Sequence, residues 1–334
     1  MGQIITNKYN LPEPLVKAVS KGTYKKRGNI SVTTLIDSPK INYLRSMHDY
    51  EVDVSEMIWA YRGSAVHHIL EVSAEELNKE YPGRFLSEFQ MEYTHKVSDK
   101  MSVNITGTGD LIDKGIGEKK AILYDYKNCS YYKISGTDVI VSGTDVVRVP
   151  KKGECLDWIR QLNIYAYILR KKYNIVVEEL RIIALLNDWD RNMITQPNYP
   201  PASIVEVSLP IYNDDIMEKF ISKRIALHLK AFFNGKKLGD DAVEPCTREE
   251  RWAKKDTWKI YTSPNNTSRS KKNFEINSEE DNIAAEFFFQ SFKASNKDAI
   301  KVLVKGSDTR CISFCPVNIH CNYFKSLIKN NNGK

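Results

Sequence analysis

The stretch Ala-Ile-Leu-Tyr-Asp-Tyr-Lys at residues 121–127 decides how the central part of this chain folds. Four apolar or aromatic residues lead into Asp125, and Lys127 follows two positions later. Side chains two residues apart in a strand point to the same face of the sheet, so Asp125 and Lys127 are predicted to lie side by side. The stretch therefore indicates a buried strand that ends in a carboxylate and an ammonium group suited to hydrolytic chemistry.

A second acidic position precedes Asp125 by fifteen residues, in the step Gly109-Asp110. The segment 101–112 is predicted to be a strand, and the glycines of residues 113–118 suit a hairpin loop that leads into the next one. On adjacent antiparallel strands, Asp110 and Asp125 could approach closely enough to share one divalent cation. The backbone carbonyl of Tyr126 is a plausible additional ligand.

A histidine pair lies upstream, on a helix predicted for residues 53–80 by the spacing of its apolar side chains. Glu71 is one helical turn beyond His67 and is expected to share its face. For that reason His67 is the preferred ligand, as a neutral imidazole, and His68 is the alternative. A third strand is predicted before the acidic pair, at residues 85–97.

Downstream, Gln161 and Tyr165 lie one turn apart on a strongly amphipathic helix predicted for residues 154–173. Taken alone, they read as an ordinary helix face. Further elements are predicted as strands at 176–186 and 204–209 and a helix at 214–233. The order α-β-β-β-α-β predicts an α/β fold, with a mixed central sheet flanked by helices on both sides.

Changes in amino-acid composition along the chain predict three regions. Residues 1–52 are predicted to be an N-terminal arm, irregular to about residue 30 and then carrying a short helix. Residues 53–234 form the core, within which residues 129–153 are expected to be a loop or a small accessory hairpin. Residues 235–334 form a polar C-terminal lobe, with a hairpin around residues 264–266 and a helix at 279–294.

Four of these elements, taken together, resemble the RecB-like branch of the PD-(D/E)xK nuclease superfamily. That branch has a histidine on a helix after a glycine, Gly-Asp on the second strand, Asp-x-Lys on the third and Gln-x-x-x-Tyr on the next helix. The chain has them in the same order within residues 55–190: Gly63 and His67, Gly109-Asp110, Asp125-Tyr126-Lys127, and Gln161 with Tyr165.

The resemblance implies a restriction-endonuclease-like fold and a metal-dependent deoxyribonuclease. It also implies that His67, Asp110 and Asp125 hold Mg²⁺ or Mn²⁺. Lys127 would assist the attacking water. Gln161 and Tyr165 would contact DNA or the edge of the active site.

Cysteines extend the comparison. Cys311-x₃-Cys315-Pro-x₄-Cys321 resembles the C-terminal triplet of the iron–sulfur members of this branch, the AddB-type and CRISPR-adaptation nucleases. Those members carry a fourth cysteine before the nuclease motifs, whereas here the best fourth ligand is Cys246. Their first spacing is also two residues rather than three. Four cysteines could hold a [4Fe–4S] cluster or a structural zinc ion, and the cluster is preferred.

The net charge of +7 over 334 residues is modest, but the cations gather in short clusters. Such clusters raise the local potential toward a polyanion, which makes DNA the expected partner, although each cluster alone could be a solvated face. No stretch approaches the ~18–20 apolar residues of a membrane span, and the first residues lack the apolar core of a secretory signal. The cytoplasm is therefore the expected location.

The leading hypothesis is an exonuclease that processes DNA ends in replication or recombination. Its size, without a helicase, resembles phage-encoded members of the group. One alternative is a DNA-binding or assembly factor that keeps the fold without catalysis. Another is an endonuclease of the defence type.

Overall fold

The computed structural model describes residues 2–20, 30–115, 120–142 and 145–332. The chain divides into two compact units, Met1–Gly239 and Asp240–Lys334. The second unit thus begins five residues beyond residue 235, where the sequence predicts the start of the polar lobe. Each unit is described below by itself.

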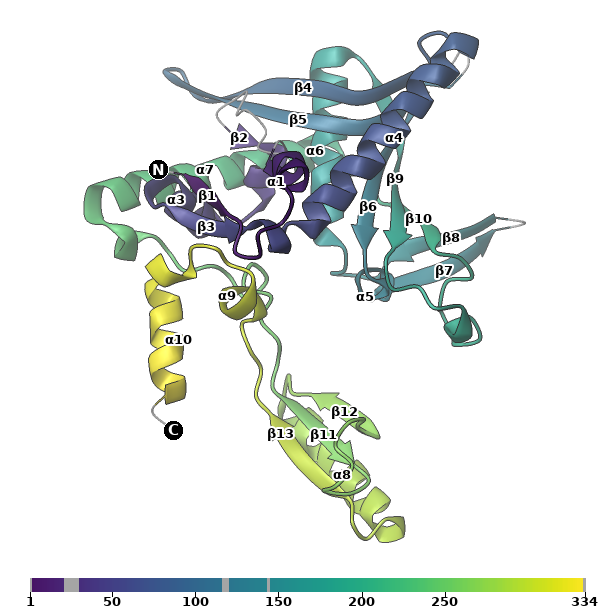
Figure 1. The fold of residues 1–334 in the computed structure, drawn as a ribbon, viewed down its shortest axis with the longest axis vertical. Helices are drawn as coiled ribbons and strands as arrows, with labels where there is room; N and C mark the ends of the chain where they lie inside the picture. The colour runs from purple at the N-terminus through teal and green to yellow at the C-terminus, as the bar shows by residue number, and fades with distance from the viewer. Residues whose placement is uncertain (1, 21–29, 116–119, 143–144, 333–334) are drawn as a thin grey trace. The chain divides into compact units, whose positions relative to one another are not determined.

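A mixed sheet is the centre of the first unit (Figure 1). Its described strands run in the order β2-β5-β6-β9-β10-β8-β7, with β4 paired to the free side of β5. Antiparallel pairs such as β5–β6 and parallel pairs such as β6–β9 both occur, which confirms the predicted α/β fold with a mixed central sheet. The strands are β2 Ile30–Ser31, β4 Phe85–Ser98, β5 Met101–Asp113, β6 Lys120–Cys129, β7 Thr137–Ser142, β8 Asp145–Pro150, β9 Val176–Leu186 and β10 Ile204–Leu209.

Two long helices pack on the central strands, α4 in front and α6 behind in the view of Figure 1. Helix α6 is buried on all its faces from Leu162 to Leu169, whereas α4 buries little besides Ala74. Helix α7 packs on α6 and α3. The helices of this unit are α1 Glu13–Ser20, α2 Val32–Ile36, α3 Pro39–Met47, α4 Ile58–Glu80, α5 Tyr131–Ile134, α6 Leu156–Tyr173 and α7 Asp214–Leu238, with short 3₁₀ turns at Val54–Glu56 and Arg191–Met193.

The N-terminal region is more ordered than its composition predicts. Strand β1 (Gln3–Thr6) pairs in parallel with β3 (Tyr50–Asp53), and helix α1 follows it, where an irregular lead-in was expected. Val32 and Leu35 are fully buried in the main core. The strand pairing joins segments about 47 residues apart in sequence, and such a long-range partner leaves no local pattern to detect.

Between β6 and α6 the structure has the small accessory hairpin that was one of the two expected alternatives, formed by β7 and β8. The predicted hairpin loop at residues 113–118 lies partly outside the described residues, which stop at 115 and resume at 120. The β5–β6 ladder on its described side is antiparallel, as the prediction requires.

The described part of the second unit contains a three-stranded antiparallel sheet in the order β12-β11-β13. Strands β11 and β12 flank the predicted turn at residues 264–266, and α8 matches the predicted helix to within a residue. Strand β13 and helix α10 were not predicted. The elements are β11 Thr257–Tyr261, β12 Lys272–Glu275, α8 Glu279–Ser295, β13 Ile300–Val304, α9 Thr309–Ser313 and α10 Asn322–Asn332, with 3₁₀ turns at Asp240–Ala242 and Asn318–His320.

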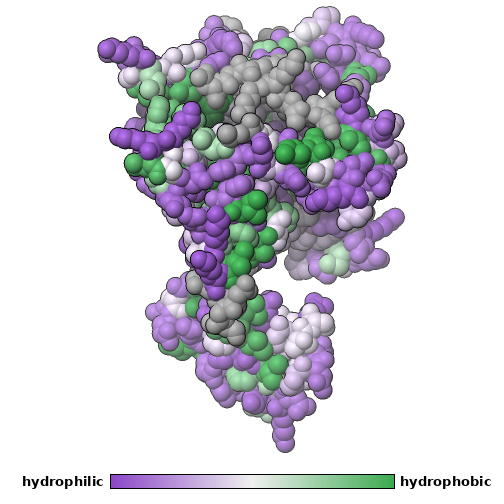
Figure 2. Space-filling model, turned by 60° about the vertical axis from the view of Figure 1, so that its left-hand side comes forward, coloured by the Kyte–Doolittle hydropathy of each residue, from purple (hydrophilic) through white to green (hydrophobic). Residues whose placement is uncertain are grey.

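The visible surface is mostly hydrophilic and is interrupted by apolar patches (Figure 2). Among the helices that the structure describes, none has the length and apolar character needed to cross a membrane.

Candidate metal centre

The acidic pair lies where strands β5 and β6 separate. Their ladder joins residues 111–113 to residues 122–124, and in the same register the next pair would be Asp110 with Asp125. At that point the backbone N–H of Tyr126 donates to Asp110 Oδ2 at 2.8 Å, so a side chain takes the place of a ladder bond. Strand β6 stays fully paired with β9 on its other side. The opening therefore leaves both carboxylates at one end of a rigid strand pair.

Asp125 and Lys127 lie together, as their spacing in the strand requires. Asp125 is 1% exposed, and the ammonium nitrogen of Lys127 is 2.5 Å from its Oδ2 atom. Gln161 on α6 donates a hydrogen bond from Nε2 to Asp125 Oδ1 at 3.3 Å. A buried carboxylate is thus held between a cation and an amide.

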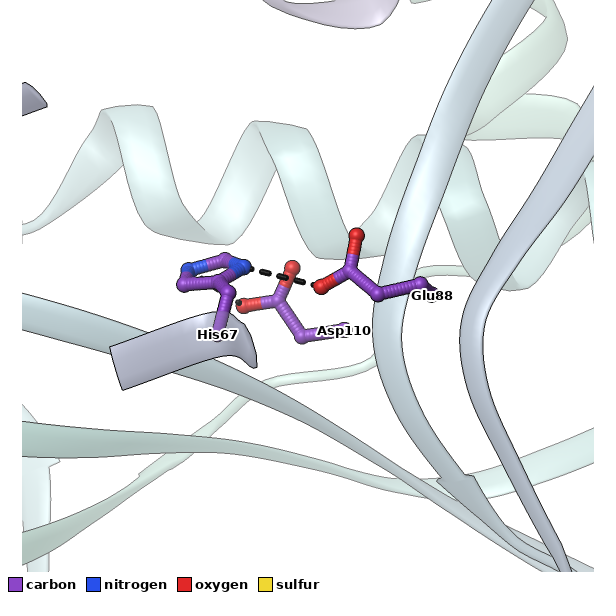
Figure 3. A group of neighbouring side chains, drawn as sticks. All are labelled: His67, Glu88 and Asp110. Carbon is purple, nitrogen blue, oxygen red and sulfur yellow. Dashed lines mark hydrogen bonds and ion pairs between the residues drawn. The ribbon is translucent and has the colours of Figure 1, made fainter. Parts of the chain in front are cut away.

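A second group of side chains forms a compact set of three, shown in Figure 3. His67 Nδ1 is 2.9 Å from Glu88 Oε1, and His67 Nε2 is 3.6 Å from Asp110 Oδ2. One ligand atom from each of the three residues lies within 4.8 Å of the others. They come from α4, β4 and β5, and they point toward one another (Figure 3). Asp125 is not part of this set and adjoins it through the opening beside Asp110.

Glu88 was missed by the sequence analysis. It lies opposite Asp110, because the β4–β5 ladder pairs Ser87 with Leu111 and Phe89 with Gly109 and skips the position between them. Its φ of +44° is unusual for a residue other than glycine, and such strain is often found at functional sites. In an antiparallel hairpin the paired residue numbers have a constant sum. A turn at residues 99–100 would point to Phe89, and the register shift between Lys96 and Ser98 moves the partner of Asp110 by one residue, to Glu88.

The reason given for preferring His67 over His68 was wrong. Glu71 does not contact His67; its carboxylate is 3.8 Å from His68, whose side chain is 77% exposed. His67 instead turns toward the sheet, where it meets Glu88 and Asp110. The choice of His67 as the histidine nearest the acidic site agrees with this geometry, but the partner that orients it comes from a strand and not from its own helix.

Negative charge in this centre is poorly compensated. Burial and the neighbouring charge of Asp125 raise the pKa of Asp110 to about 7. Burial likewise raises the pKa of Asp125, although Lys127 opposes the shift. Burial lowers the pKa of Lys127, but attraction to Asp125 and Asp110 outweighs it, so that pKa lies above its ordinary value. The hydrogen bond with Glu88 raises the pKa of His67.

A divalent cation would compensate this negative charge. The donor set of Glu88, Asp110 and His67 offers carboxylate oxygens and an imidazole nitrogen, which suit Mn²⁺ well and Mg²⁺ through the oxygens. Burial and the charge of Asp125 disfavour the ionised form of Asp110, and a bound cation would favour it. The residues present therefore fit the metal that the sequence motifs imply.

Tyr165 supports the centre from within the core. It is 3% exposed, and its hydroxyl accepts a hydrogen bond from Gln161 Nε2 at 3.2 Å. Gly107 makes room for the ring, since a Cβ there would lie 2.4 Å from Tyr165 Cε1. Tyr165 is thus not accessible to a polymer, whereas Gln161 is half-buried and contacts Asp125.

In the second unit, Cys246, Cys315 and Cys321 each lie within electrostatic range of Cys311. Burial raises the pKa of Cys311 to about 12, and the charges of Cys246, Cys315 and Cys321 contribute to the shift. Cys311 and Cys321 are buried, and Cys246 and Cys315 are half-buried. In the described residues no set of three cysteine sulfurs lies within 4.8 Å. A single zinc ion, with Zn–S bonds of ~2.3 Å, would need such a spacing, whereas a cluster spreads its ligands wider.

Comparison with known proteins leaves the family open. No family model matches the chain, and no curated protein matches it. Among solved structures, the one described as "Crystal structure of SSO0001" matches with a TM-score of 0.37 and 17% sequence identity, over 66% of this chain and 88% of that chain. So distant a likeness carries no conclusion about function.

Proposed function

We propose that this protein is a metal-dependent deoxyribonuclease of the RecB-like branch of the PD-(D/E)xK superfamily, with a restriction-endonuclease-like core. One observation carries the proposal. The motif residues converge where β5 and β6 separate, with Lys127 2.5 Å from Asp125 and with His67 beside Asp110. Residues from three elements, α4, β5 and β6, thus bring two carboxylates, a lysine and a histidine to one place.

Each side chain has a role that follows from its place. Glu88, Asp110 and His67 would hold Mg²⁺ or Mn²⁺, with Asp125 and the Tyr126 carbonyl as adjoining ligands. A bound divalent cation supplies charge stabilisation and an activated water for phosphodiester hydrolysis. Lys127 brings a fixed positive charge to the same place, where it can orient the water and stabilise charge on the phosphate.

Gln161 has a positioning role. It donates to Asp125 while Tyr165 accepts from the same amide nitrogen, so the carboxylate is held in one orientation. Preorganised groups of this kind need little rearrangement when the reaction occurs.

The remaining parts of the proposal come from the sequence. DNA is the expected polyanion, the expected location is the cytoplasm, and a phage-encoded exonuclease acting in replication or recombination is the preferred context. Cys246, Cys311, Cys315 and Cys321 would hold a [4Fe–4S] cluster, with structural zinc as the alternative. A cluster there would stabilise the second unit, which has little core of its own.

The test uses end-labelled linear DNA and covalently closed circles of the same sequence, each single and double stranded, with Mg²⁺, Mn²⁺ or chelator. The proposal expects metal-dependent release of nucleotides from linear DNA, with circles left intact. Cutting of the circles would instead indicate the defence-type endonuclease. Binding to DNA without cleavage at any metal concentration would indicate the non-catalytic DNA-binding factor.

A further inference from the structure

The second unit contains a cavity of about 460 Å³ whose lining carries four cationic side chains: Arg248, Arg251, Lys254 and Lys255. Backbone closes part of its wall. Gly306 packs so tightly that a Cβ would lie 2.2 Å from the carbonyl oxygen of Lys254. A cavity of this size is ordinary for a small-molecule or nucleotide-sized ligand.

The two carboxylates in the lining are already engaged. Asp256 accepts from Lys305 Nζ at 2.7 Å and from the Gly306 N–H at 2.8 Å. Asp308 accepts from Arg251 Nε at 3.1 Å and from the Tyr323 hydroxyl at 2.6 Å.

Arg248 and Lys254 are paired less closely, although Arg248 is near enough to Asp256 to help lower the pKa of that carboxyl group. Within the described ranges no carboxylate oxygen lies within 4.0 Å of the charged groups of Arg248 and Lys254, and both side chains are exposed. The ammonium group of Lys255 donates to Asn277 Oδ1, and the carboxylate of Glu275 is 3.9 Å from it. The cavity thus offers an excess of positive charge, which suits phosphate groups.

Two exposed aromatic residues, Trp252 and Phe314, form a platform, and both are close in sequence to residues that line the cavity. Trp252 is 50% exposed and Phe314 is 61% exposed, and their ring centroids are 5.5 Å apart. The guanidinium of Arg310 lies 5.2 Å from the Trp252 ring centroid. Trp252 falls between two residues of the cavity lining, Arg251 and Ala253.

The platform is held in place by its backbone. Trp252 has a φ of +53°, a strained value for so large a residue, and its N–H donates to the Glu249 carbonyl at 3.0 Å. The Arg310 N–H donates to the Arg251 carbonyl at 3.0 Å, which ties the turn to α9. The backbone around Trp252 and Phe314 therefore keeps two large apolar rings at the surface, although the hydrophobic effect favours burying them.

We propose that this face of the second unit is a binding site for single-stranded DNA, with phosphates held by Arg248, Lys254 and Lys255 and bases stacked on Trp252 and Phe314. A basic cavity beside an aromatic platform is the combination by which proteins bind single strands without reading their sequence. A free nucleotide would use the cavity and leave the platform idle, so a strand fits both features better. The preference for DNA over RNA rests on the proposed function; the site itself does not require the acidic centre to be catalytic.

Binding is measured with the full chain carrying Asp125→Asn, so that cleavage does not interfere, and failure of the nuclease proposal leaves the result readable. The probes are a fluorescent oligothymidylate and an abasic oligonucleotide of equal length. Trp252→Ala should weaken binding of oligothymidylate about fivefold or more, as expected for the loss of one stacked base, and leave the abasic strand unaffected. Trp252→Phe should restore most of the affinity. Phe287→Ala is the matched control, since this ring is 77% exposed on α8, outside the cavity lining.

The phosphate arm uses Arg248→Ala and Lys254→Ala, with exposed Lys297→Ala as control. Each cavity variant should weaken both probes and reduce the slope of log affinity against log salt by about 0.7, the value for one phosphate of a single strand. Equal weakening of both probes by Trp252→Ala would overturn the stacking role. Thymidine monophosphate bound as tightly as the oligonucleotide would replace the strand site by a nucleotide pocket, and tighter binding of oligouridylate would replace DNA by RNA.

Discussion

At the scale of single residues, substitutions of Asp125 and of Lys127 should affect the stability of the fold differently. Asp125→Asn removes the buried charge, while Lys127 is 26% exposed and keeps the charge of Asp110 nearby, so cleavage should fall at least about a hundredfold while the melting temperature stays unchanged or rises. Lys127→Met should lose cleavage as well, but it leaves Asp125 buried without its cation and should lower the stability by about 3 kcal/mol. Paired melting curves and cleavage rates check both. Equal melting temperatures for the two variants would contradict the buried ion pair.

Glu88 and His67 should govern metal affinity. Removing either ligand should weaken Mn²⁺ binding by about tenfold or more, because a set of three ligand atoms loses one member. Excess Mn²⁺ should partly rescue cleavage by His67→Ala. Glu71→Gln is the control, since the ion-pair partner of Glu71 among the described residues is the exposed His68. Calorimetric titration with Mn²⁺ makes the measurement, and an unaltered affinity in Glu88→Gln would remove Glu88 from the centre.

Asp110 gives the site a pH dependence of known sign. Its pKa is raised from 3.8 to about 7, so the folded state resists ionisation that the unfolded state accepts. The stability that this group contributes is present below pH ~4 and is lost as the pH rises to about 7. Metal affinity should rise over the same range, because ligands must lose their protons. Comparison with Asp110→Asn isolates the effect. A wild-type profile parallel to that of the variant would argue against the raised pKa.

The sequence indicated most of these residues because each belongs to a short local pattern. Asp125 and Lys127 alternate in one strand, and Gln161 and Tyr165 are one helical turn apart. Glu88 was not predicted because it lies opposite Asp110 on a neighbouring strand, and because its unusual φ has no sequence signature. Local patterns find residues on one element, whereas strand register is needed to find a partner on another.

At the scale of elements, a close approach between β5 and α6 positions the acidic centre. Gly107→Ala would place a methyl group against the Tyr165 ring, at a cost of about 1–3 kcal/mol for overpacking. Displacing Tyr165 should also loosen Gln161 and reduce cleavage. Gly63→Ala is the matched control, because a Cβ there meets nothing within 4 Å and should stabilise helix α4 by about 0.5–1 kcal/mol. Denaturant unfolding compares the two, and equal stability would contradict the close approach.

Elements with strong periodicity were predicted nearly to the residue, as β9 and β10 show. The failures were short elements that depend on distant partners. Strand β1 pairs with β3, and strand β13 pairs with β11. Both β1 and β13 are too short to be recognised from their own sequence pattern. Their existence is set by tertiary pairing and not by intrinsic propensity.

At the scale of the whole molecule, the cysteines should decide how the second unit is stabilised. Anaerobically purified protein should be brown and contain iron if Cys246, Cys311, Cys315 and Cys321 hold a cluster. Colourless protein with one equivalent of zinc would favour the structural ion. Cys321→Ser should lower the melting temperature of the second unit before it affects cleavage, with Cys129→Ser as control. Metal-free protein with six titratable thiols would contradict both forms of the site.

The central claim is that the side chains gathered where β5 and β6 separate form one metal centre that cleaves DNA. Its most direct test is the rate at which end-labelled linear DNA is degraded by the wild-type protein and by Asp110→Asn, at saturating Mn²⁺ and at pH ~8, where Asp110 should be ionised. We expect degradation by the wild type that chelator abolishes, and a loss of at least about a hundredfold in Asp110→Asn with the fold intact. Equal rates for the two proteins, or cleavage that persists in chelator, would contradict it.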